Sequence, residues 1–178
     1  MSRQYWNATL PPFPVADGTA LASSTTLTDI SPAPQITLPA GTLEAGMKIE
    51  LEAFATFSTT GTPTLLVGFY YGGVAGSALA ASSAVTTGSG AASWPLILRY
   101  RGQVRAVGTS GSIVGQGTLQ LGTSLTAFSM RAIPETSGAR TVSIDTTAAK
   151  TITVGAQWGT NSASNTITLN DLAVTLLN

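Results

Sequence analysis

Apolar and polar side chains alternate along two long segments of this chain, and no other feature constrains its fold as strongly. In the segment 47–57 the odd positions are apolar, and the even positions begin with Lys48, Glu50 and Glu52. In the segment 94–107 most even positions are apolar, while Arg and Gln occupy odd ones. Successive side chains of a strand point to opposite faces. The pattern therefore predicts antiparallel strands with one face in a core and the other in solvent.

Short segments of this type recur about every ten residues from Ala20 onward, with Gly, Pro, Ser and Thr between them. This spacing predicts an all-β fold, an antiparallel β-sandwich over residues 20–178. The Ala- and Ser-rich segment 74–85 is expected to be a loop with a brief strand. The predicted strands are 21–29, 35–38, 47–58, 64–71, 94–107, 113–121, 127–132, 141–144, 150–158 and 166–176.

The last predicted strand changes phase part-way along. Its apolar residues are at odd positions up to Leu169 and at even positions from Leu172 onward. One extra residue in a strand produces such a change, so we expect a β-bulge at Asn170 and Asp171.

The segment 64–71 is apolar on both faces. Leu65 and Val67 share one face with further aromatic residues, and Leu66 and Tyr70 occupy the other. Such a strand is either central in the fold with both faces covered, or lies at a contact between subunits.

Residues 1–19 differ from the rest and are expected to form an extended N-terminal arm. Prolines at positions 11, 12 and 14 disfavour both helix and ladder pairing. The arm also carries Tyr5, Trp6 and Phe13. These aromatic residues need a surface to bury against. That surface is either a neighbouring subunit or the arm's own sandwich, and the sequence favours neither.

The composition argues against an enzyme. The chain has no His and no Cys, which removes the commonest general base and metal ligand and every thiolate nucleophile. Glu50 and Glu52 share a strand face at roughly 7 Å, a separation found in glycosidases. Lys48 lies on the same row, however, and a solvated charge ladder is the simpler interpretation. We expect no catalytic residue, no cofactor and no metal.

The charge balance limits the partners. Lys and Arg number 8, Asp and Glu number 8, and only 9% of the residues are charged. We therefore expect neither nucleic acid nor a membrane surface as a partner, since both call for a basic surplus. A weakly charged surface opposes self-association little, which favours a place in an assembly.

Two charged rows have alternative interpretations. Arg99, Arg101 and Arg105 form a basic row, and Glu50 and Glu52 form an acidic one. If the two strands are neighbours in one sheet, the rows pair with each other. Alternatively, either row binds a complementary patch on another subunit, for which the Arg guanidinium is well suited.

Several turn-rich runs, taken in order, resemble virion proteins of tailed bacteriophages, among which phages of actinobacteria are the expected source. The resemblance extends from about Leu38 to the C-terminus and excludes roughly the first 30 residues. The runs are LPAGTLEAG at 38–46, GTPTL at 61–65, GGVAGSALA at 72–80, TTGSGAASWP at 86–95, QWGT at 157–160 and SASNT at 162–166.

This resemblance implies a jelly-roll-like β-sandwich displayed on the virion. The first seven residues lack the apolar core of a signal peptide, so we expect synthesis in the host cytoplasm. The resemblance also implies a capsid decoration or head-fibre subunit, commonly a homotrimer, that binds the major capsid protein at the outer surface of the shell. The alternative is a minor tail or receptor-binding domain that binds host-surface glycan through aromatic residues such as Tyr70, Tyr71 or Trp158. The residues expected at interfaces are Tyr5, Trp6, Phe13, Leu66, Tyr70, Arg99, Arg101 and Arg105.

Overall fold

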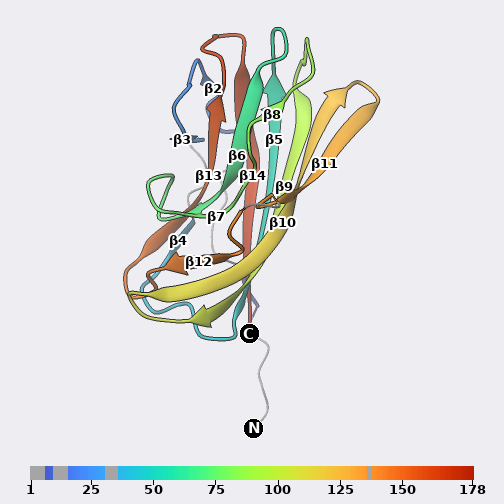
Figure 1. Cartoon of the computed structure of the whole chain (residues 1–178). Helices are drawn as coiled ribbons and strands as arrows, with labels where there is room; N and C mark the ends of the chain where they lie inside the picture. The colour runs from blue at the N-terminus through green and yellow to red at the C-terminus, as the bar shows by residue number, and fades with distance from the viewer. Residues whose placement is uncertain (1–6, 10–15, 31–35, 136–137) are drawn as a thin grey trace.

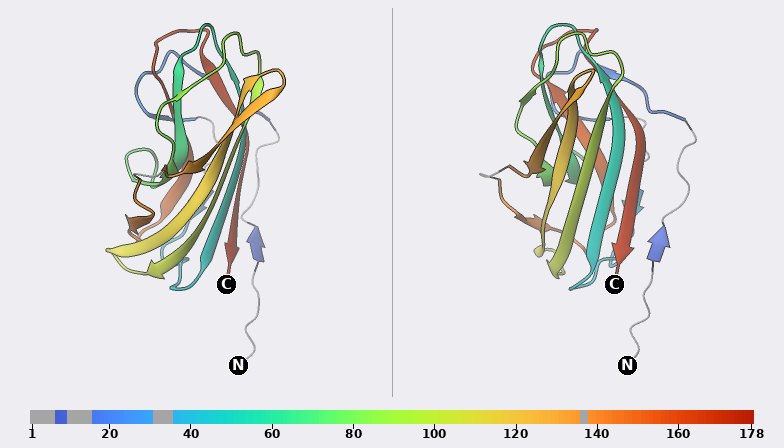
Figure 2. Two further views of the ribbon diagram at one scale, coloured as in Figure 1. Left: turned by 45° about the vertical axis from the view of Figure 1, so that its right-hand side comes forward. Right: turned by 90° about the vertical axis from the view of Figure 1, so that its right-hand side faces the viewer.

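A computed structural model describes residues 7–9, 16–30, 36–135 and 138–178. These residues form two antiparallel sheets that face each other as a jelly-roll-like sandwich (Figures 1 and 2), which confirms the predicted fold class. No part of the chain that the structure describes is helical, so it contains no helix that could cross a membrane.

The eight-stranded sheet has the order β1-β14-β5-β9-β10-β11, with β2 also paired to β14 and β12 to β10. Its strands are β1 (Asn7–Thr9), β2 (Leu21–Ala22), β5 (Lys48–Ser58), β9 (Trp94–Ala106), β10 (Gly111–Ser124), β11 (Ala127–Ile133), β12 (Thr141–Ile144) and β14 (Thr166–Leu177).

The six-stranded sheet has the order β3-β13-β6-β7, with β4 also paired to β13 and β8 to β6. Its strands are β3 (Thr28–Asp29), β4 (Ile36–Leu38), β6 (Thr64–Tyr71), β7 (Ser77–Ala81), β8 (Val85–Thr86) and β13 (Lys150–Trp158).

The core lies between the sheets and follows the period of two. The odd positions of β5 from Ile49 to Phe57 are all buried, as predicted. Phe57 also contacts Trp94 edge to face, with ring centroids 6.2 Å apart. The register of β14 on β5 passes from Leu169 to Asp171 with one residue skipped, so the predicted bulge is confirmed at Asn170.

Four strand predictions need correction. The segment 21–29 is two short strands, because Ser23 adopts a left-handed φ of 53° and the chain crosses from one sheet to the other. The segment 74–85 holds two strands, β7 and β8, because both pair with the buried strand β6.

Strand β10 extends beyond 113–121 at both ends, since it pairs with β9, β11 and β12. Ala106 leaves the core face because the register of β9 shifts after Val104.

Part of the N-terminal arm pairs with its own chain. Residues 7–9 lie antiparallel to residues 175–177 at the edge of the eight-stranded sheet. The expectation that the arm stays outside the ladders is therefore wrong for this segment, which contains no proline and keeps every backbone N–H. Tyr5, Trp6 and Phe13 lie outside the described residues.

The two-faced strand β6 is central in its sheet, as in the first of the two alternatives, and its outer face is covered at Tyr70 and partly covered at Leu66. On its outer face, Tyr70 lies against Gly155 and is only 4% exposed. Val74, in the β6–β7 loop, closes over the same position. Asp29 holds this loop in place, because its carboxylate accepts hydrogen bonds from the Val74 backbone N–H (3.2 Å) and the Thr153 hydroxyl (2.6 Å).

Tyr100 covers a pair of glycines on the core side of the eight-stranded sheet. Gly102 of β9 and Gly115 of β10 are register partners. A Cβ atom at either position would collide with the Tyr100 side chain. The ring thus fills the space that two missing side chains leave, an arrangement that stabilises glycine within strands. Burial raises the pKa of the Tyr100 hydroxyl.

The Tyr100 hydroxyl is buried without a hydrogen-bond partner among the described residues. Replacing it by hydrogen, Tyr100→Phe, removes an unpaired polar group and should leave the free energy of unfolding unchanged or raise it by up to about 1 kcal/mol. Tyr71→Phe is the matched control, because that hydroxyl donates to the Asp145 carbonyl at 3.0 Å. It should lower the free energy of unfolding by about 1 kcal/mol. Urea denaturation measures both, and equal losses would contradict the assignment.

Candidate docking face

The surface of interest is the side of the eight-stranded sheet that faces away from the six-stranded sheet, here called the outer face. The right-hand view of Figure 2 looks onto this sheet. Register and alternation place the following side chains on it: Ala173 and Thr175 of β14; Glu50, Glu52 and Phe54 of β5; Ile97, Arg99 and Arg101 of β9; Gln116, Thr118 and Gln120 of β10; and Phe128 and Met130 of β11.

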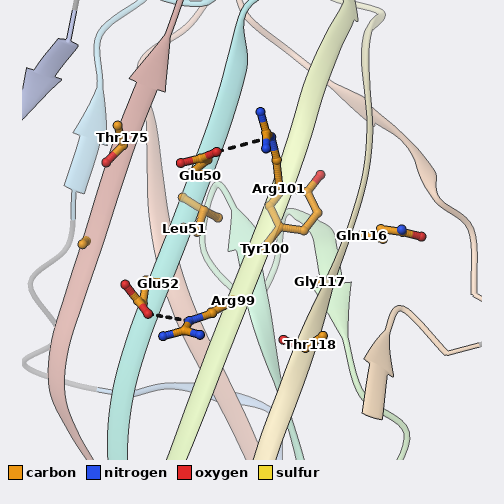
Figure 3. Close-up of a pocket in the computed structure, with 11 residues that line it drawn as sticks. Glu50, Leu51, Glu52, Arg99, Tyr100, Arg101, Gln116, Gly117, Thr118 and Thr175 are labelled. Carbon is orange, nitrogen blue, oxygen red and sulfur yellow. Dashed lines mark hydrogen bonds and ion pairs between the residues drawn. The ribbon is translucent and has the colours of Figure 1, made fainter. Parts of the chain in front are cut away.

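Two ion pairs occupy the centre of the outer face (Figure 3). Glu50 and Arg101 are register partners on β5 and β9, and so are Glu52 and Arg99. The Arg101–Glu50 distance is 3.3 Å and the Arg99–Glu52 distance is 2.6 Å. The first interpretation of the charged rows, pairing within one sheet, is therefore confirmed for these four residues. Arg105 is exposed and forms no ion pair with the residues that the structure describes.

These pairs stabilise the fold only modestly. Their side chains are 37–61% exposed, so water screens the attraction. Cross-strand pairs of this type contribute about 0.2–1 kcal/mol each. Much of the charged surface remains available for contacts outside the chain.

A hollow of about 320 Å³ opens over the same pairs. Both glutamates and both arginines line it, together with Gln116 and Thr118 on one side and Ala173 and Thr175 on the other. The flanking side chains on β14 are short, so the longer charged residues border a depression.

Apolar side chains are exposed at one end of this face. Phe54 lies next to the half-buried Ile97 on the neighbouring strand. Farther out, Phe128 and Met130 on β11 are 63% and 67% exposed, and Leu125 at the β10–β11 turn is 88% exposed. This hairpin holds three of the five large apolar side chains that are exposed among the described residues. Exposed apolar groups that lie together mark contact surfaces.

Sequence reasoning placed a strand at β11 but missed its exposed apolar side. Only the pairing of β11 with β10 shows which side of β11 is exposed. Met130 is the partner of Gln120, and Arg131 is the partner of the buried Leu119. The apolar residues of β11 are therefore on the solvent side, which becomes visible only once the register is known.

The predicted site residues do not form one site. Arg99 and Arg101 lie on the outer face of the eight-stranded sheet, whereas Leu66 and Tyr70 belong to the six-stranded sheet. Leu66 is half-buried, and Tyr70 is buried by the β6–β7 loop, so its predicted place at an interface is wrong. Tyr71 and Trp158 are buried too. None of the three aromatic residues expected to bind glycan is exposed.

The ionisable groups with perturbed pKa values serve structural roles. Hydrogen bonds from the Thr147 hydroxyl and backbone N–H lower the pKa of the Asp145 carboxyl. A hydrogen bond from Ser83 lowers the pKa of Glu135, which also pairs with Arg131. Within the described ranges, no three Asp or Glu residues gather as they would around a metal ion.

No family model matches this chain, and no similar curated protein or solved structure was found.

A double-mutant cycle on Glu52→Ala and Arg99→Ala in dilute protein tests the ion-pair geometry. We expect a coupling of about 0.2–1 kcal/mol in the free energy of unfolding, which falls at high salt because the pair is exposed. The cycle with Arg101→Ala in place of Arg99→Ala is the control, since Glu52 and Arg101 are diagonal neighbours. A diagonal coupling as large as the direct one would contradict the register.

Proposed function

We propose that this chain is a structural protein of a tailed-bacteriophage virion, a capsid decoration protein that binds the outer surface of the shell. The resemblance of residues 38–178 to phage virion proteins suggests the class of protein. The observation that carries the proposal is the exposed apolar hairpin β10–β11, with Leu125, Phe128 and Met130 in solvent. Attachment of this type needs no chemistry, only a contact of about 800 Å² per partner.

The hairpin suits a protein contact for two reasons. Strand β11 is at the edge of the eight-stranded sheet, and an uncovered edge strand offers backbone groups for pairing. Its apolar side chains also add area that water does not solvate well. The major capsid protein is the proposed partner of this edge, and the aromatic residues of the arm are proposed as a second contact. The proposed assembly state is the homotrimer that the resemblance implies.

One observation favours the alternative, a minor tail or receptor-binding domain that binds host-surface glycan. A hollow of about 660 Å³ at the end of the sandwich is lined by the half-buried Trp94, by Leu125, and by the hydroxyls of Ser89, Ser124 and Thr126. An aromatic ring beside hydroxyl groups can bind a sugar through its apolar surface and its polar rim.

The hairpin is tested by the triple variant Leu125→Ser, Phe128→Ser and Met130→Ser, added to phage particles stripped of the wild-type protein. Truncation of interface hot spots costs about 2 kcal/mol or more, so capsid affinity should fall by at least about tenfold. Val107→Ser is the control, because this side chain is 50% exposed and lies outside the hairpin. Undiminished occupancy by the triple variant would overturn the assignment of the hairpin.

The arm is tested by deleting residues 1–14. The sandwich should still fold, because every core residue that the structure describes lies beyond the deletion and the only described strand lost is the edge strand β1. Circular dichroism should keep its β-sheet spectrum. Capsid binding should be lost. Full occupancy of capsids by the truncated protein would remove the arm from the proposal.

The copy number per virion separates decoration from the tail alternative. On the order of hundreds of copies are expected for a protein that covers a symmetric shell. A handful of copies, with glycan binding abolished by Trp94→Ala, would favour the tail function instead.

A further inference from the structure

We propose that the outer face binds a second copy of this chain around a twofold axis that runs parallel to the strands and between β5 and β9. The proposal concerns the chain alone and does not rest on its attachment to a capsid. It is an alternative to the homotrimer that the resemblance implies, because a twofold contact joins chains in pairs. It follows from the order of charges that the register of these two strands fixes.

The charge pattern is complementary to itself under this rotation. Such an axis lays β5 of one copy over β9 of the other without changing the level along the strands. Glu50 then faces Arg101 of the second copy, because the two residues are already register partners within one chain. For the same reason Glu52 faces Arg99 of the second copy. All four charges of the two ion pairs thus meet an opposite charge, while Lys48 at the end of the same row faces the neutral Gln103.

The uncharged side chains near the axis also face compatible partners under this rotation. Phe54 faces Ile97 of the second copy, which places the two apolar residues of the central rows against each other. One strand farther from the axis, Ala173 and Thr175 of β14 face Thr118 and Gln116 of β10. No apolar residue of the central rows is opposed by a charge.

The other simple arrangement is unfavourable. A twofold axis perpendicular to the strands would lay β5 on β5 and β9 on β9. The glutamate row would then face glutamates, and Arg99 and Arg101 would face arginines. Like charges placed opposite each other in an interface are strongly repulsive. The charges therefore select one orientation of the second copy.

The outer face is large enough and has room for the contact. The strands that overlap under this rotation are β14, β5, β9 and β10. At about 4.8 Å apart and ten residues long they span roughly 19 by 33 Å, or about 600 Å², which is the lower end of the area per partner in stable interfaces. Facing sheets pack about 10 Å apart and at about −30° because each is twisted. The rows nearest the axis thus stay opposed, and the hollow over the ion pairs accepts the arginine side chains of the second copy.

A charge-swapped variant tests the axis. Glu50→Arg, Glu52→Arg, Arg99→Glu and Arg101→Glu together keep both ion pairs within the chain and keep the face complementary to itself. Sedimentation should give this variant and the wild type the same mass, an even multiple of 18.0 kDa. The swap leaves the composition and the mass of the chain unchanged, so the wild type is labelled uniformly with ¹⁵N before the two are mixed. Native mass spectrometry should then detect no dimers of intermediate mass, because in a mixed dimer arginine would face arginine and glutamate would face glutamate.

Two half-swapped variants provide the converse test. Arg99→Glu with Arg101→Glu in one chain, and Glu50→Arg with Glu52→Arg in another, should each be monomeric alone. Mixed together, they should form a heterodimer, because the acidic face of one then meets the basic face of the other. Absence of that heterodimer while both chains are folded would contradict the proposed contact.

Phe54→Ser should weaken the dimer by about tenfold or more, because it removes the central apolar contact. Phe128→Ser is the matched control, since Phe128 is an exposed phenylalanine of the same sheet at a distance from the axis, and the dimer should persist. A wild-type chain that is monomeric at every concentration up to about 1 mM would overturn the proposal. So would free mixing of the charge-swapped variant with the wild type, or a trimer that none of these substitutions affects.

Discussion

The antiparallel register of β5 and β9 determines both faces of the eight-stranded sheet. On one side it places Leu51 beside Tyr100 in the core, and on the other it places Glu50 beside Arg101 in solvent. A slip of one residue would send every one of these side chains to the opposite face. The buried apolar residues make such a slip very unfavourable, so the core holds the surface charges in their order. The ion pairs are a consequence of the register rather than its cause, since each pair contributes little to the free energy of unfolding.

The glycines that Tyr100 covers lie where β10 changes one of its neighbours. Gly102 and Gly115 have no side chains between β9 and β10, and the Tyr100 ring takes that space. Beyond this point β10 changes partners: its first residues pair with β12 and its later residues pair with β11. One strand thus serves two neighbours along its length, and β11 is left as an edge that extends past the six-stranded sheet (Figure 1).

The sequence predicted what a period of two can encode and missed what depends on contacts between distant segments. The strands of the core and the bulge at Asn170 follow from local patterns. The pairing of the charged rows was one of two alternatives that the sequence left open, and the register of β5 on β9 decides it. The burial of Tyr70 does not, because it requires a loop that Asp29 holds in place from another part of the chain. The exposure of the apolar side of β11 could not be predicted either, since Phe128 and Met130 have the pattern of core residues until their partners on β10 are known. The candidate site therefore lies elsewhere than most of the residues first selected.

A surface with balanced charges recognises partners in a particular way. The chain has no net charge, so long-range attraction does not steer it toward any partner. At short range, however, the placement of Glu and Arg on two neighbouring strands favours the twofold axis parallel to the strands over the perpendicular one, because the latter opposes like charges. Apolar contact at Phe54 and Ile97 would supply attraction in either orientation of the second copy. In the proposed dimer the charges would act by excluding the arrangement that opposes like charges, so ion pairs that add little to folding would determine how a second copy binds the outer face.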